Sequence, residues 1–340
     1  MPEGPEVKLL TEKVSSLVVG KQVVSACVLS GKYLTKQKIQ GWDLFLSKLP
    51  LNVVEMGCHG KFIYLKFDQD IALGVGLGMV GTFTTDPDAK HNRIVLGLEN
   101  GRSLCYNDFR NFGHWCFYQS WNDLDKKIGK LGVDVLSEDG LNIKEVDRIY
   151  HRCLKQNICK VLMNQDVISS IGNYLKAECL YREKVYPLVN VGDLGLEKFR
   201  SIISTARSIG LQSYDLQKTG GISYRGFAVA GEDQDYIPLS KSQTLFMVYD
   251  QKQDPMGFDV SKMTTPDGRT TSWVPQVQTI GSPGQTPYVQ IPCVKQVVPI
   301  ISSGRHLNDQ ELDELVSEDD NISLVDDISE MVVLDDEIDD

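Results

Sequence analysis

The first twenty residues place the tightest constraint on how this chain folds. Pro5 suits the first position of a helix, and Gly4 is a plausible N-cap in front of it. Apolar residues recur at helical spacing until Gly20 stops the run: Val7, Leu10, Val14 and Leu17. The sequence therefore predicts a helix with one buried face directly behind the N-terminus.

The residues in front of this helix carry reactive groups. Methionine aminopeptidase removes Met1 when the next residue is small, which would make Pro2 the mature N-terminus. Its secondary amine has no proton to lose before it attacks an electrophilic carbon, and it condenses readily to an iminium ion. An unperturbed α-amino group titrates near ~8, so part of it is free base at neutral pH. With the Glu3 carboxylate beside it, the pair suits covalent catalysis, unless both residues merely open the helix.

The expected helix also acts on the charge of these groups. Its positive end favours a neutral amine at Pro2 and ionised carboxylates at Glu3 and Glu6. We therefore expect a nucleophilic amine flanked by two charged acids.

The opening seven residues closely resemble the N-terminus of the Fpg/Nei family of DNA glycosylases. Five further segments resemble the family in the same order: residues 60–62, 77–81, 108–113, 131–134, and 171–174 with Glu178. In the family, residues 60–62 match a Gly-Lys turn, 77–81 a strand, and 171–174 the helix–two-turns–helix signature. Each piece is short, but six matches in order over roughly residues 1–278 make coincidence a poor explanation.

The resemblance implies a bifunctional DNA glycosylase/AP lyase that needs no cofactor. Pro2 would attack C1′ of the damaged nucleotide and form an iminium intermediate as the base leaves. Glu3 would assist opening of the sugar ring by proton transfer, and Glu6 would position the N-terminus. Lys61 would reach a phosphate or the sugar reaction centre, although a lone lysine in a hairpin is usually a solvated charge. β-Elimination followed by δ-elimination would cut the strand on both sides of the sugar.

A base inside a duplex must be flipped out before a nucleophile can reach it, and side chains must fill the hole. By resemblance, Met79, Arg110 and Phe112 fill it, since Met adapts to gaps, Phe stacks and Arg bonds the widowed base. Asn173, at the start of a helix, would contact phosphate near the lesion. The alternatives are a core methionine, an ordinary turn at residues 110–112, and a simple helix cap at Asn173.

The last segment departs from the zinc-containing members of the family. Residues 267–273 resemble the tip of their finger, where an Arg, here Arg269, meets the phosphates around the flipped nucleotide. Residues 180–292 contain no Cys and no His, so the usual ligands of a structural zinc site are missing and we expect no metal. The segment resembles the zincless finger of certain Nei-like glycosylases. Apolar packing would replace the metal, through Phe246, Val248, Tyr249, Trp273 and Val274.

Net charge is unevenly distributed along the chain. The 340 residues carry a net charge of −11, but residues 281–340 alone hold 15 acids and two bases. The remaining 280 residues hold 33 bases and 31 acids, a net of +2. The catalytic part is thus close to neutral, and DNA binding would need a locally basic lining.

These patterns predict an α+β chain of three parts. Residues 1–137 would form a helix and a β-sandwich, with Asn100-Gly101 as a hairpin turn. Residues 138–280 would form the helix–two-turns–helix domain with the zincless β-hairpin finger. We expect helices up to residue 216, with Ile143, Val146, Ile149 and Tyr150 on one face and Phe199, Ile202 and Ile203 on another. Residues 217–240 would be a mobile loop and residues 281–340 a disordered acidic tail.

The proposed substrates are oxidised pyrimidines and hydantoins in double-stranded DNA, and abasic sites. Two alternatives remain: a catalytically silent module that binds damaged DNA, and a purine-directed glycosylase of the Fpg type. Eight cysteines in mostly apolar stretches indicate free thiols in a reducing, intracellular compartment, the nucleus or another site of DNA. No run is long enough to span a membrane and no signal peptide opens the chain, and we expect a monomer. Met331 opens an apolar patch with an acidic flank that resembles a SUMO-interacting motif, although a merely solubilising tail is the simpler interpretation.

Overall fold

The computed structural model describes residues 2–219 and 245–282, and everything below concerns these residues. The chain divides into two units, residues 1–289 and 290–340, of which only the first is described. Nearly all of the loop expected at residues 217–240 lies outside the described residues. So do most of the acidic tail and the patch at Met331.

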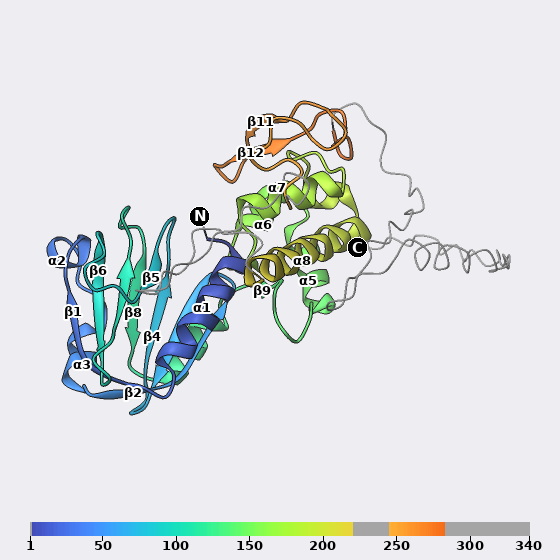
Figure 1. Cartoon of the computed structure of the whole chain (residues 1–340). Coiled ribbons are helices and arrows are strands. Elements are labelled where there is room, and N and C mark those ends of the chain that lie inside the picture. Colours follow the sequence, from blue (N-terminus) through green and yellow to red (C-terminus); the bar gives the residue numbers. More distant parts are fainter. Residues whose placement is uncertain (1, 220–244, 283–340) are drawn as a thin grey trace, which may run out of the picture. The chain divides into compact units, whose positions relative to one another are not determined.

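The N-terminal part is a helix followed by antiparallel strands (Figure 1). Its helices are α1 (Gly4–Val18), α2 (Lys32–Thr35), α3 (Trp42–Ser47) and α4 (Trp121–Ile128). Its strands are β1 (Gln22–Val28), β2 (Leu51–His59), β3 (Phe62–Phe67), β4 (Ile71–Gly76), β5 (Thr82–Thr84), β6 (Asn92–Leu98), β7 (Ser103–Asn107) and β8 (His114–Tyr118). The hairpin predicted at Asn100-Gly101 joins β6 to β7 and is confirmed, with Gly101 at a φ of 77°.

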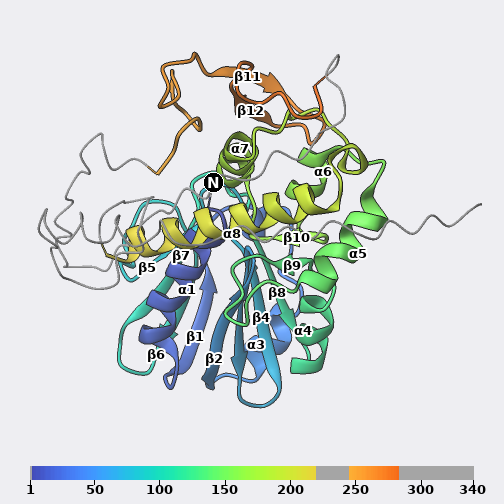
Figure 2. The same cartoon turned by 90° about the vertical axis from the view of Figure 1, so that its right-hand side faces the viewer.

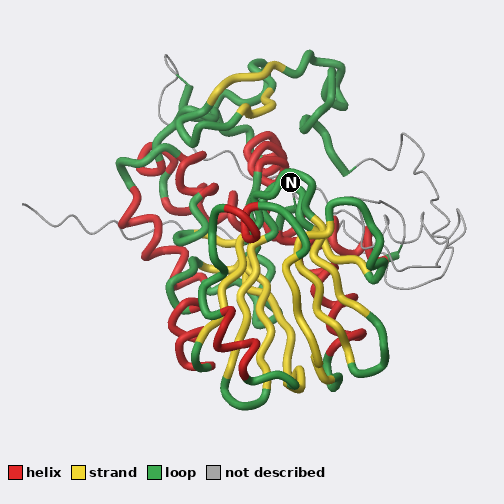
Figure 3. Tube along the Cα trace, turned by 90° about the vertical axis from the view of Figure 1, so that its left-hand side faces the viewer, coloured by secondary structure: helices red, strands yellow, loops and turns green. Residues whose placement is uncertain are grey.

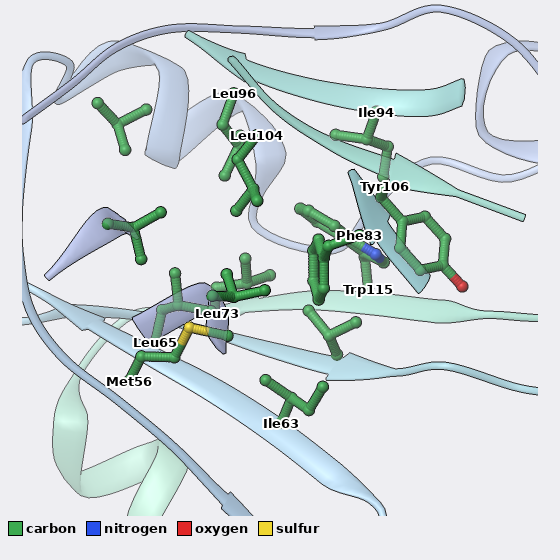
Figure 4. Close-up of a cluster of buried hydrophobic side chains, with 14 of the residues drawn as sticks. Met56, Ile63, Leu65, Leu73, Phe83, Ile94, Leu96, Leu104, Tyr106 and Trp115 are labelled. Carbon is green, nitrogen blue, oxygen red and sulfur yellow. The ribbon is translucent and has the colours of Figure 1, made fainter. Parts of the chain in front are cut away.

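These strands form two layers around one apolar core. Their order is β5-β7-β6-β1-β2-β3-β4-β8, and β1 pairs with β2 only through Gln22 with Asn52 and Val23 with Leu51. The sheet folds over at this short pairing. Ile94, Leu96, Leu104 and Tyr106 of one layer then face Met56, Ile63, Leu65, Leu73 and Trp115 of the other (Figure 4). Buried and half-buried residues alternate along β6, with the period that a strand with one more deeply buried face requires. The predicted α+β class with an N-terminal sandwich is confirmed.

The remaining described residues are mainly helical (Figure 2). The elements are β9 (Val133–Asp134), α5 (Ile143–Cys153), α6 (Ile158–Met163), β10 (Ile168–Ser169), α7 (Asn173–Arg182), the 3₁₀ helix η1 (Val191–Leu194), α8 (Leu196–Lys218), β11 (Ser261–Thr264) and β12 (Thr270–Trp273). A second apolar core lies among these helices, and α1 packs against both β2 and α8. The tube in Figure 3 shows most of the strands side by side, with helices beside and above them. A domain boundary at residues 137/138 remains a prediction.

Three local expectations are corrected. Helix α1 begins at Gly4, and its N-cap is Glu3, because Glu3 and Glu6 form a reciprocal capping box. Ile143 is 43% exposed because it opens α5, where the first turn projects beyond the core that holds Val146 and Ile149. Residues 78–80, expected within a strand, form a turn between β4 and β5. The buried face at Phe199, Ile202 and Ile203 is confirmed.

Helix α7 anchors the C-terminal hairpin β11–β12 through polar side chains as well as apolar ones. Val248 and Val274 are fully buried against it, as expected. Phe246 instead joins the core of the helices, and Trp273 packs against Tyr186. Apolar packing was expected to hold this segment. The structure adds Glu178, a fully buried carboxylate that accepts hydrogen bonds from the backbone N–H groups of residues 247–249 at 2.7–2.9 Å.

Among the described residues, no helix is both long and apolar enough to cross a membrane.

The first prediction concerns Glu178. In Glu178→Gln, one carboxylate oxygen becomes an NH₂ group that faces backbone N–H donors, so stability should fall by about 2 kcal/mol. Hydrogen exchange at residues 247–249 should accelerate. Urea denaturation and amide exchange measure both effects, with Glu145→Gln, an exposed partner of Arg148, as the control. Unchanged exchange at residues 247–249 would contradict this anchoring role.

Candidate active site

The side chain of Glu3 joins the N-terminus of the chain to the start of α7. Its Oε1 accepts the N–H of Tyr174 at 2.8 Å, and its Oε2 accepts those of Gly172 at 2.9 Å and Leu175 at 3.2 Å. These are backbone donors of the first turn of α7, which has no side-chain cap of its own. The Glu3 carboxylate therefore precedes α1 in the sequence but accepts the free backbone N–H groups at the start of α7.

Glycines make this close approach possible. A Cβ at Gly172 would lie 2.2 Å from Cδ of Glu3, and one at Gly4 would lie 2.4 Å from Cβ of Ser170. Gly60, at a φ of 58°, would place a Cβ 2.5 Å from Cβ of Ser169. Any side chain at these positions would push the crossing segments apart. Three of the segments that resembled a glycosylase in sequence, residues 1–7, 60–62 and 171–174, thus meet at one place in the structure.

Lys61 lies at the same crossing, in the turn between β2 and β3. Its Nζ donates to the carbonyl oxygen of Ile171 at 2.7 Å. Burial lowers the pKa of Lys61, while the nearby charges of Glu3 and Glu6 act to raise it and that of Arg269 to lower it. The lysine is therefore not a freely solvated charge, and both Glu3 and Arg269 lie within its electrostatic reach.

The protonation of Glu3 differs from the expectation. Burial raises its pKa from 4.5 to about 7, against the opposing effects of the Lys61 charge and the backbone hydrogen bonds. Burial likewise raises the pKa of Glu6. The field of a helix end and three N–H donors do not offset the removal of a carboxylate from water. Glu3 is thus placed to exchange a proton near neutral pH, and the prediction of a fully ionised Glu3 is wrong.

Glu6 lies beneath this pair in a buried polar network. Its Oε2 accepts the backbone N–H of Glu3 at 2.7 Å. Its Oε1 accepts the hydroxyl of Tyr174 at 3.0 Å and the amide of Gln217 at 2.7 Å. Tyr174 and Gln217 belong to α7 and α8, so Glu6 ties the first residues of α1 to both helices. This geometry suits a residue that positions the N-terminus.

The three expected void-filling residues lie on two neighbouring turns. Asp108 fixes one of them by accepting the backbone N–H groups of Arg110, Asn111 and Gly113 at 2.8–3.1 Å. Phe112 is 54% exposed, and the guanidinium of Arg110 lies 4.8 Å from its ring centre. Met79 is half-buried, and the backbone of Phe112 would lie 2.8 Å from a Cβ at Gly78. An exposed aromatic ring on a rigid turn is available to insert into a partner.

The hairpin tip approaches the start of α7 from the other side. Arg269 is exposed on the turn between β11 and β12, where Gly268 has a φ of 75°. Nδ2 of Asn173 donates to the carbonyl oxygen of Thr270 at 2.9 Å, and Oδ1 of Asn173 is buried without a hydrogen-bond partner. Gly172, and not Asn173, is the N-cap of α7, so the simple capping role is wrong.

Two polar residues of this region, Asp134 and Lys176, were not among the site residues predicted from the sequence. Asp134 accepts the N–H of Gly60 at 2.8 Å and the hydroxyl of Ser170 at 2.5 Å, which fixes the lysine turn. Lys176 forms a buried ion pair with Asp267. Asp134 ends a segment that resembled the family and could have been suspected, whereas Lys176 carries no such signal. Among the described residues, no group of three His, Cys, Asp or Glu side chains is placed to hold a metal.

The comparisons with known proteins agree with this geometry. Residues 1–115 match the family model of the formamidopyrimidine-DNA glycosylase N-terminal domain. A formamidopyrimidine-DNA glycosylase of Corynebacterium glutamicum is 27% identical over 270 residues, which is 76% of this chain and 91% of the relative. One of Mycolicibacterium smegmatis is 30% identical over 193 residues, 54% of this chain and 66% of the relative. The chain belongs to the Fpg/MutM family of DNA glycosylases.

Solved structures of the family share the fold. A Lactococcus lactis Fpg mutant, solved with DNA that contains Fapy-dG, is 20% identical with a TM-score of 0.66. The match covers 82% of this chain and all of that one. A complex of the wild-type enzyme with DNA that contains an oxidised pyrimidine matches with a TM-score of 0.67. Family membership makes this chain a DNA glycosylase that acts in DNA repair.

The second prediction follows from the raised pKa of Glu3. Between pH 4.5 and about 7 the folded state holds a proton that the unfolded state has lost. The resulting stability is full below pH 4.5 and disappears as pH rises through 7, about 3 kcal/mol at most. Glu3→Gln cannot titrate, so its free energy of unfolding should fall less steeply in this window.

Urea denaturation at a series of pH values measures this difference. Glu99→Gln, which changes an exposed carboxylate at the end of β6, should run parallel to the wild type. A Glu3→Gln curve that is also parallel to the wild type would contradict the raised pKa. Lys61, whose pKa is lowered, acts in the opposite sense at higher pH, so the test stays below pH 7.

Proposed function

We propose that this chain is a bifunctional DNA glycosylase/AP lyase that excises oxidised bases in base excision repair. The observation that carries the proposal is the Glu3 carboxyl group, buried next to Pro2 with a pKa raised to about 7. A group that titrates near neutral pH can both give and take a proton during one turnover. Lys61 shares its surroundings and helps to set its charge.

In the proposed reaction, the amine of Pro2 forms a bond to C1′ of the damaged nucleotide. The bond from C1′ to the base breaks, and the base leaves with its electron pair and takes up the proton that the Pro2 nitrogen loses. Glu3 then gives its proton to O4′ as the sugar ring opens, which leaves an iminium between the Pro2 nitrogen and C1′. Loss of a proton from C2′ expels the 3′ phosphate, and a second elimination expels the 5′ phosphate. Water finally hydrolyses the iminium and restores the amine.

Positive and polar groups around this centre would hold the DNA backbone. We assign Arg269 and Asn173 to the phosphates on either side of the flipped nucleotide, and Lys61 to the sugar or its phosphate. The Asn173 amide is held at the first turn of α7 by hydrogen bonds to the carbonyl oxygen of Thr270 and to the side chain of Tyr249. The rigid turn at Asp108 supports the assignment of Phe112, Arg110 and Met79 to the space that the base vacates.

The preferred substrates that we propose are oxidised pyrimidines and hydantoins. A second candidate is a preference for formamidopyrimidine lesions of purines, because the relatives in Corynebacterium and Mycolicibacterium carry that name. Borohydride trapping on duplexes with one defined lesion each separates the two. Trapping with pyrimidine lesions would support the first candidate, and trapping with purine lesions the second.

The third prediction concerns the nucleophile. Pro2→Gly should lower base excision at least 100-fold, because the secondary amine that condenses to an iminium is replaced by a primary one outside its optimal geometry. Glu3→Gln should have a similar effect through loss of the proton donor. Both variants should still bind a duplex with an abasic-site analogue. An uncleaved N-terminal tag should also stop trapping, since it converts the amine to an amide; wild-type trapping in Pro2→Gly would refute the assignment.

The fourth prediction concerns the hairpin, which we propose to be a zincless finger. Purified protein should contain no stoichiometric zinc, and chelators should leave the glycosylase rate unchanged, because residues 180–292 lack Cys and His. Elemental analysis and single-turnover assays with and without chelator test this. One equivalent of tightly bound zinc would show that ligands from elsewhere in the chain complete a metal site.

A further inference from the structure

A buried ion pair joins α7 to the tip of the hairpin. Nζ of Lys176 lies 2.7 Å from Oδ2 of Asp267, and the two side chains are 0% and 4% exposed. Lys176 lies one turn after the start of α7, whose first N–H groups donate to Glu3. Asp267 lies two residues before Arg269. The pair thus connects the two sides of the candidate site through the interior.

The hydroxyl of Thr265 relays this contact to the arginine. It hydrogen-bonds Asp267, lies 3.4 Å from Nζ of Lys176, and contacts the carbonyl oxygen of Arg269 at 3.0 Å. The backbone N–H of Thr265 donates to the same Arg269 carbonyl at 2.9 Å. The turn therefore has little freedom to move relative to Asp267, and Asp267 has little freedom relative to Lys176.

Stability alone is a weak reason for such a pair. Taking two charges out of water costs several kcal/mol per ion, and apolar residues of similar size in the same place are often equally stable or better. Other contacts already attach the segment to α7, namely Glu178 at residues 247–249 and the buried Val248 and Val274. What the pair adds is direction, because an ion pair with hydrogen bonds fixes an orientation that apolar packing does not.

We propose that the Lys176–Asp267 ion pair positions Arg269 for the DNA phosphate. It fixes the hairpin tip relative to the start of α7, so that Arg269 presents its charge beside Lys61 and Glu3. Neither Lys176 nor Asp267 touches DNA, because both are buried; they act through Arg269. The inference rests on the proposed function, since it assumes that Arg269 meets a phosphate.

A double variant without the two charges tests this directly. Lys176→Met with Asp267→Leu leaves neither a buried unpaired charge nor a large cavity, so the protein should keep its fold and melting temperature. It should nevertheless bind an abasic-site duplex about tenfold more weakly, as Arg269→Ala does, and its salt slope should fall by about one unit. Adding Arg269→Ala to the double variant should weaken binding of the duplex by less than a further factor of two, because the arginine is already displaced.

Several controls keep the outcome decisive. Lys262→Met removes an exposed cation from β11, 3.8 Å from Asp250, and should not abolish the effect of Arg269→Ala. If the double variant does not fold, Thr265→Val tests the relay instead, with the same non-additivity expected. A folded double variant with wild-type affinity, or an undiminished tenfold effect of Arg269→Ala within it, would overturn the inference. If wild-type protein gives no borohydride trapping, the proposed function has failed, whereas the binding cycle still reports on the ion pair.

Discussion

The contact between the Glu3 carboxylate and the first turn of α7 organises the described structure. The Glu3 side chain accepts three backbone N–H groups at the start of α7, and it also caps α1. The two helices it joins are separated by about half of the chain in sequence. The capping role holds the carboxylate out of water, and burial then raises its pKa to about 7. The same contact therefore supplies both the junction between α1 and α7 and the raised pKa of Glu3.

The tightness of this junction depends on residues that have no side chain. Gly4, Gly60 and Gly172 each allow backbone to approach where a Cβ would fall at 2.2–2.5 Å from a neighbour. Gly132 does the same against the backbone of Val167, at 2.1 Å. These four glycines come from short motifs that are far apart in the sequence, yet all of them allow close contacts at the same junction. Each marks a contact between the segment that joins α6 to α7 and another part of the chain: the N-terminal residues, the β2–β3 turn or residue 132.

Local patterns predicted much of this fold, because turns and amphipathic periods depend on neighbouring residues. The β6–β7 hairpin and the buried face of α8 are of this kind. Pro2 and Glu3 could be singled out from their chemistry, whereas the other site residues could be named only through family resemblance, and long-range pairing could not be predicted at all. Lys176 and Glu178, in the middle of α7, look like a solvated helix face, yet both are fully buried. Their partners lie about 70 to 90 residues away, and nothing in the local sequence indicates that a hairpin covers them.

The covering of α7 explains why its charges point toward the hairpin. Eight consecutive residues of this helix, 174–181, are buried, which is unusual for a surface helix and requires partners on every side. Apolar side chains occupy the core side, next to α6 and α8. On the hairpin side, Lys176, Glu178 and Tyr181 each meet a defined polar partner. A small β-hairpin buries too little apolar surface to select one orientation, because dispersion contacts are not directional. Directional polar contacts from α7 can select one orientation of the hairpin. Because Glu3 holds the start of α7, these contacts also fix the position of Arg269 relative to the Glu3 carboxyl group.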